Sequence, residues 1–331
     1  MKSLKNKLLL SVWMLVATLV TLASTTYAWF ASNREVILDE FDMELDTQQN
    51  LLISVDGENF SSRISKDDLK KAISAKYKGV SFNEAQASDF DDVKFEPVTT
   101  YDLNTFKEIS NNLDEDKNYI LTDTDVKKGQ FISFDLWFQY TSFKNDSNSY
   151  YITFVGDTYA EKNNTVATSI SGSRSEVILN NSLVTPEKSY KSGETIEIDT
   201  GGALRLGVTT SDNQNLIYEP NLGIASYAID GETDDRYNPD MNPMLTYFNN
   251  LNLGNLKPIT ENKDFYKNTI KSFDTNQKLA TLVNENNSFN NVKITVYVWL
   301  EGMDADYIIG CTDTNLKMVL NFCVKEVEEV Q

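Results

Sequence analysis

Acidic side chains are the most abundant candidates for chemistry in this sequence. The chain of 331 residues has 49 Asp and Glu against 30 Lys and Arg, which gives a formal net charge of −19. Carboxylates spaced along one loop can supply several of the six to eight oxygen ligands that Ca²⁺ takes. Among several acidic clusters, the best candidate Ca²⁺ site is Asp230, Glu232, Asp234 and Asp235. The full EF-hand pattern is absent.

The acidic composition also has a simpler interpretation. A high net charge keeps a secreted protein from aggregating, and it needs no ligand to explain it. The same charge is repelled by nucleic acid and by anionic lipid headgroups. We therefore expect no nucleic-acid partner, and no cofactor other than Ca²⁺ as a candidate.

Paired carboxylates could instead hydrolyse a glycosidic bond, a reaction that needs two of them about 5–10 Å apart and no histidine. The sequence singles out no such pair among its 49 acids. Trp137 and Trp299 are candidate platforms for sugar rings, because each stands on a predicted strand opposite its more aliphatic face. Burial of both indoles beneath an inserted segment is the simpler interpretation.

The chain contains no histidine. This excludes the Ser-His-Asp and Cys-His hydrolases and the zinc sites built on histidine. It also removes the side chain that usually responds to pH near neutrality. Since no other catalytic signature is present, we expect a protein that is not an enzyme.

The two cysteines, Cys311 and Cys323, are a candidate disulfide, as expected for an extracellular protein. A simple hairpin turning at residues 312–315 would leave their alpha carbons roughly 23 Å apart, at ~3.3 Å per residue. A disulfide requires about 7 Å or less. The bond therefore forms only if the segment 306–315 folds back on itself.

The elements that must position these residues are mostly strands. Short runs with alternating polarity recur between turn residues, helices are few, and no βαβ alternation is present, which favours an all-β fold, an antiparallel β-sandwich of the jelly-roll kind. The clearest strands are 130–140, 150–159, 203–209, 292–300 and 316–324, and 66–77 is the clearest helix. We expect 150–159 to be the hairpin partner of 130–140. One large domain, 29–331, would carry insertions near 56–117 and 230–275.

The first predicted strand, Glu35–Leu45, comes after the N-terminal leader. From Asp39 onward it alternates apolar and acidic residues, as a half-buried strand does. An N-terminal strand can complete the open sheet edge of a neighbouring molecule. The residues that would enter such an edge are Val36, Leu38, Phe41, Met43 and Leu45.

The leader itself has the parts of an export signal. Lys2, Lys5 and Lys7 form a cationic head, and no charged residue occurs from 8 to 33. Ala28 then offers a small residue at which a signal peptidase could cut, before Trp29. The uncharged run exceeds the ~20 residues that span a bilayer, so an uncleaved anchor is the alternative. The predicted boundary of the signal peptide is 1–28.

The residues from Thr26 to Asn33 read Thr-Tyr-Ala-Trp-Phe-Ala-Ser-Asn. This stretch resembles the leader ends of secreted surface and matrix proteins of Gram-positive bacteria, the TasA/camelysin-like group processed by a SipW-type signal peptidase. The resemblance covers about the first tenth of the chain. It implies a jelly-roll-like sandwich, a surface or biofilm-matrix location, and in some members fibres joined through the N-terminal strand. The metalloprotease activity described for camelysin does not carry over, because this chain has no histidine or zinc motif.

Together these observations predict a secreted or cell-surface structural protein that self-assembles as a biofilm-matrix or fibre subunit. It would be membrane-anchored if the leader is not cut. A module that binds cell-wall or matrix glycans is the alternative, and a carboxylate-only hydrolase is a third class. The leader, through its signal peptidase, is the main functional observation in the sequence.

Overall fold

The computed structural model describes just over half of the chain. The described residues are 14, 36–45, 51–76, 98–100, 102–113, 119–124, 131–141, 149–172, 174–178, 183–184, 189–191, 193–220, 269–270, 272–285, 288–301 and 314–327. The chain divides into two units, Met1–Glu35 and Val36–Gln331. The second unit contains every strand of the described residues.

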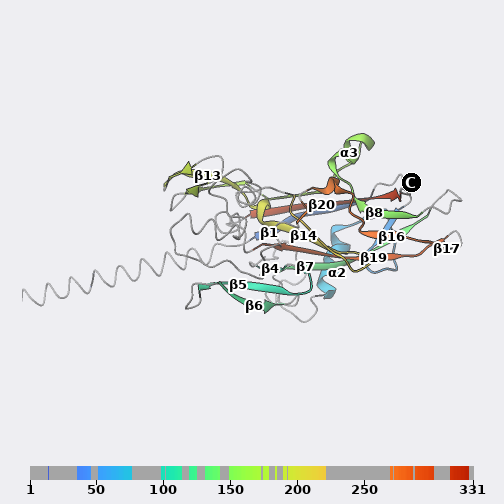
Figure 1. Cartoon of the computed structure of the whole chain (residues 1–331), viewed down its shortest axis with the longest axis horizontal. Helices are drawn as coiled ribbons and strands as arrows, with labels where there is room; N and C mark the ends of the chain where they lie inside the picture. The colour runs from blue at the N-terminus through green and yellow to red at the C-terminus, as the bar shows by residue number, and fades with distance from the viewer. Residues whose placement is uncertain are drawn as a thin grey trace, which may run out of the picture. The chain divides into compact units, whose positions relative to one another are not determined.

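Two large sheets form the centre of the second unit (Figure 1). In spatial order, the first is β16 (Ala280–Leu282), β8 (Tyr150–Phe154), β20 (Thr314–Glu326), β1 (Val36–Leu45) and β3 (Arg63–Ile64), with β9 (Ser169–Gly172) also paired to β20. The second is β15 (Asn215–Tyr218), β14 (Leu204–Thr209), β19 (Val292–Leu300), β7 (Ile132–Tyr140) and β2 (Leu51–Ser54). We call them the first and the second sheet.

The remaining elements are small. They are the sheet β4 (Val98–Thr99), β5 (Phe106–Leu113) and β6 (Tyr119–Thr124), and the two-stranded pairs β10 (Arg174–Ile178) with β13 (Thr195–Asp199), β11 (Leu183–Val184) with β12 (Ser189–Tyr190), and β17 (Asn284–Glu285) with β18 (Ser288–Phe289). The helices are α2 (Lys66–Lys76), α3 (Asp157–Asn163) and the 3₁₀ turns η4 (Thr200–Ala203) and η6 (Phe273–Thr275).

The inner faces of the two large sheets share one hydrophobic core, which makes the fold a β-sandwich. Phe138 of β7 and Phe322 of β20 meet across it, with ring centroids 5.0 Å apart in an edge-to-face arrangement. The alternation predicted for β7 is confirmed: Ile132, Phe134, Leu136 and Phe138 are fully buried, whereas Asp135 and Trp137 between them are partly exposed. The all-β prediction with a few short helices is therefore confirmed.

Two local predictions were wrong. The strand β8 does not pair with β7, because it lies in the other sheet between β16 and β20. The alternating pattern identified both strands but carried no information on which sheet each joins. The predicted strand 150–159 also ends early, at Phe154, since Asp157–Asn163 forms helix α3.

The strand β1 departs from the antiparallel pattern, because it runs parallel to β20. Its apolar residues change phase: 36 and 38 are even, whereas 41, 43 and 45 are odd. A β-bulge between Leu38 and Glu40 absorbs this change, since it adds one residue, Asp39, to β1 only. All five predicted core residues therefore stand in register with alternate residues of β20: Val36 with Thr314, Leu38 with Leu316, Phe41 with Met318, Met43 with Leu320 and Leu45 with Phe322.

A close contact joins the small β4–β6 sheet to the outer face of the second sheet. Leu103, 2% exposed, has a left-handed backbone with φ of 54°, which is unusual for leucine. Its side chain fills the space beside Gly207 of β14, where a Cβ would lie 2.5 Å from Leu103 Cδ2. The Leu103 amide donates to Thr100 Oγ1 at 3.1 Å, which holds the turn.

This contact predicts that Gly207→Ala lowers the free energy of unfolding by about 1–3 kcal/mol, the usual cost of overpacking a filled site. Leu103→Ala in the same chain should recover part of the loss, because it vacates the space. Urea unfolding of the two single variants and the double variant measures this coupling. Strictly additive effects would show that the two residues do not share the space.

Candidate functional site

The predicted site residues fall into two groups. The candidate Ca²⁺ ligands Asp230, Glu232, Asp234 and Asp235, the cleavage residues Ala28 and Trp29, and Cys311 lie outside the described residues. Cys323 is described and fully buried, with Sγ 4.0 Å from Phe154 O, and its pairing with Cys311 stays a prediction. The predicted donor residues of β1 are described by their backbone pairing alone.

The surroundings of β1 form the first candidate site. On one side β1 pairs with β20 over nine residues of that strand, Thr314–Phe322. On its other side, the described residues provide only Arg63 and Ile64 of β3, which pair with Glu44 and Met43. We call the place beside β20 that β1 occupies the β1 slot.

The floor of the β1 slot is strongly apolar. Met318, Leu320 and Phe322 of β20 are each 0% exposed. Burying a side chain of this size stabilises a fold by about 1.5–3 kcal/mol. An empty β1 slot would therefore expose these apolar side chains to water. Either the chain's own β1 or an equivalent strand would stabilise the fold by covering them.

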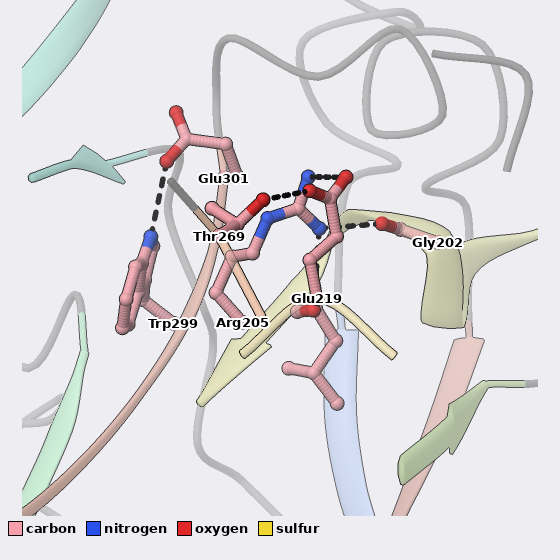
Figure 2. Close-up of polar contacts among 7 residues, drawn as sticks. Gly202, Arg205, Glu219, Thr269, Trp299 and Glu301 are labelled. Carbon is pink, nitrogen blue, oxygen red and sulfur yellow. Dashed lines mark hydrogen bonds and ion pairs between the residues drawn. The ribbon is translucent and has the colours of Figure 1, made fainter. Parts of the chain in front are cut away.

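A buried polar centre lies on the outer side of the second sheet and forms the second candidate site (Figure 2). Arg205 of β14 and Glu219, directly after β15, are both 0% exposed. Arg205 Nη2 donates to Glu219 Oε1 at 2.7 Å, and Arg205 Nη1 donates to Gly202 O at 2.6 Å. Thr269 Oγ1 donates to the other carboxylate oxygen, Glu219 Oε2, at 2.9 Å.

The backbone explains why these residues meet. Register places Leu206 of β14 opposite Tyr218 of β15, so Arg205 and Glu219 follow as the next facing positions. Ile270 joins β15 through a parallel bridge to Tyr218, and the Glu219 amide donates to Ile270 O at 2.9 Å. The carboxylate of Glu219 thus binds Thr269, which lies 50 residues further along the chain.

A second buried carboxylate lies beside this centre. Glu301, 0% exposed, follows β19 and accepts a hydrogen bond from Trp299 Nε1 at 3.2 Å (Figure 2). Trp299 stands directly opposite Arg205 in the β14–β19 register. Because Glu219 and Glu301 are both fully buried, neither faces a substrate as the paired acids of a glycosidase must.

Sequence reasoning identified one part of this centre. A charged residue inside the apolar strand 203–209 indicates a paired or an edge residue rather than a substrate anchor, and Arg205 is paired, with Glu219. Glu219 and Thr269 were missed, since nothing in their local pattern distinguishes them. The only available signal was general: a buried arginine requires a carboxylate, and Glu219 is the acid nearest to the end of the adjoining strand.

The partly exposed Trp137 is not an open platform for a sugar ring. Gly57, at a φ of 77°, lies against its indole, where a Cβ would be 3.1 Å from Trp137 Cδ2. Lys293 Nζ lies 5.7 Å from the ring centroid, within cation–π range. Trp299 is fully buried. The two tryptophans therefore give the glycan-binding alternative no support.

A partly exposed carboxylate near Trp137 fastens helix α2 to the second sheet. Asp135 accepts hydrogen bonds from Thr295 Oγ1 at 2.8 Å and from Lys76 Nζ at 3.0 Å. Burial alone would raise the pKa of Asp135, but the hydrogen bonds from Thr295 and Lys76 and the charges of Lys76 and Lys293 outweigh it. The net pKa lies below the usual value.

The lowered pKa of Asp135 predicts an acid-dependent loss of stability. The folded state holds this carboxylate ionised, so its contribution is complete above the unfolded pKa of about 3.9 and disappears as the pH falls through the lower folded value. Wild-type protein should therefore lose more stability than Asp135→Asn between about pH 5 and pH 2. Urea midpoints across this range measure it, with the exposed Asp67→Asn as the charge-matched control. Parallel curves for wild type and Asp135→Asn would contradict it.

Neither a metal centre nor a membrane span occurs among the described residues. They contain no group of three or more Cys, Asp or Glu arranged to hold a metal ion. They also contain no helix with the length and apolar character needed to cross a membrane. Comparison of the chain with protein-family models, with curated proteins and with solved structures finds no match.

Proposed function

We propose that this protein is a secreted or cell-surface structural protein that assembles through its N-terminal strand, as a subunit of a matrix or fibre. The observation that carries the proposal is the position of β1. It is the first strand of its unit, it fills a slot between β20 and the short β3, and only residues 29–35 separate it from the predicted leader.

Three physical features support exchange of this strand between molecules. Only residues 46–50 join β1 to β2, which lies in the other sheet, so β1 is joined to the rest of its unit at one end. Exchange of an identical element costs little, because β1 makes the same interactions in the slot of another molecule as in its own. The apolar floor of the slot disfavours the empty state.

The leader supports the location. A cationic head, a long uncharged run and the residues around Ala28 are those of an export signal, and they resemble the leaders of Gram-positive surface and matrix proteins.

A reversible lock on β1 tests the proposal. Asp42 and Val319 are partners in the β1–β20 register, so Asp42→Cys with Val319→Cys would tie β1 into its own slot, in a background with Cys311→Ser and Cys323→Ala. We expect electron microscopy to show assemblies when the exported protein is kept reduced, and none when the monomer is oxidised before it can assemble. The background protein alone should assemble in both conditions.

Two outcomes would overturn the proposal. One is a protein that stays monomeric at high concentration even when reduced. The other is a locked protein that assembles as well as the reduced one, because assembly would then use another surface.

A further inference from the structure

The β1 slot carries basic residues beside two of the four acids of its strand. Register places Glu40 of β1 beside Lys317 of β20, and Lys317 is exposed. Register also places Glu44 of β1 opposite Arg63 of β3. Between Val36 and Leu45 the strand has four acids and no base. Opposite charges at facing strand positions stabilise a pair, and like charges destabilise it.

We propose that the β1 slot selects its occupant by charge, that its partner is the β1 strand of a second copy of this chain, and that Glu40 and Lys317 are the specificity pair. This inference rests on the proposed strand exchange and adds to it the identity of the partner and the residues that recognise it.

The register defines what the slot accepts. Apolar residues stand at 36, 38, 41, 43 and 45, in register with alternate residues of β20, and the one extra residue at 39 lies in the bulge. Acids stand at 40 and 44, beside Lys317 and Arg63. A strand must match both the broken apolar spacing and the two acidic positions, and β1 of a second copy does so by construction.

Competing occupants fit less well. A basic extended peptide would place like charges beside Lys317 and Arg63. An apolar strand with unbroken alternation would match the floor of the slot but would lack both acids. If two copies associated through any other surface, their affinity would not depend on the charges at positions 40 and 317.

Reciprocal charge reversal tests the specificity pair. One protein carries Glu40→Lys and keeps Lys317; the other carries Lys317→Glu and keeps Glu40. Each alone has like charges at this pair, both within a chain and between identical copies. In a mixture, reciprocal exchange restores opposite charges in both slots. The full chains would be exported with tags of different mass, mixed, and resolved by native mass spectrometry.

In an equimolar mixture we expect the ratio of mixed to unmixed dimers to exceed its statistical value by about 5-fold, as fits two pairs changed from like to opposite charge. The excess should fall as salt is added. Differently tagged copies that both carry Glu40→Gln and Lys317→Gln are the matched control and should show no excess. The chain carrying both Glu40→Lys and Lys317→Glu should regain the thermal midpoint that each reversal lowers, which shows that the reversed pair folds.

The failures are distinguishable. If differently tagged wild-type copies form mixed species but the reversed pair shows no excess over the glutamine control, the charge inference is overturned and strand exchange stands. If wild-type copies never form mixed species under any condition, strand exchange and the inference are both overturned.

Discussion

Glu219→Ala is expected to lower the free energy of unfolding by about 3–5 kcal/mol, the cost of removing one partner from a buried ion pair. The substitution would leave the guanidinium of Arg205, 0% exposed, without the carboxylate 2.7 Å away, and would release Thr269 from the same group. Chemical unfolding in urea measures the loss. Glu219→Gln should lose less, because its amide oxygen still accepts a hydrogen bond.

The matched control removes both charges. Arg205→Met with Glu219→Leu should be much closer to wild type than Glu219→Ala, since a buried ion pair replaced by apolar side chains of similar volume is often neutral. A loss below about 1 kcal/mol for Glu219→Ala would mean that water reaches the pair. It would contradict the complete burial on which this candidate site rests.

The second large effect comes from deleting a single aspartate from β1. Removing Asp42 shifts the alternation between the two halves of the strand, so Glu40 takes a core-facing register position and Phe41 leaves one. The expected loss is about 3–5 kcal/mol, comparable to truncating a buried phenylalanine. Thermal and urea unfolding of the exported chain measure it.

Deleting Asp39 removes the same residue type three positions earlier and is the matched control. Because Asp39 is the extra residue of the bulge, its loss leaves an unbroken strand with every pairing in phase, and stability should change by less than about 1 kcal/mol. Equal losses from the two deletions would contradict the observed register.

The fold class could be predicted from the sequence because the alternation of polar and apolar residues along a strand is a local signal. The inward residues of β7 and the strand β19 follow directly from their period of two. Sheet membership is not local. The strand β8 follows β7 closely in sequence yet crosses to the other sheet, where its partners β16 and β20 come more than 120 residues later.

In the candidate sites, too, local features could be predicted from the sequence and long-range partners could not. The apolar residues of β1 were predicted, but their phase change had no explanation until a bulge at Asp39 placed all five beside β20. The apolar neighbours of Arg205 predict a paired or an edge residue. Its partners Glu219 and Thr269 are set by strand order and by a chain return 50 residues later, which periodicity does not encode.

The central claim, that β1 of one copy enters the slot of another, is tested most directly by cross-linking between chains. One protein would carry Asp42→Cys and a second Val319→Cys, each with Cys311→Ser and Cys323→Ala, so that neither chain alone can form the link within itself. After mixing, assembly and treatment with a short thiol cross-linker, we predict a covalent dimer joining position 42 of one chain to position 319 of the other. Assemblies that form without this link, while the chain carrying both cysteines links internally, would contradict the account.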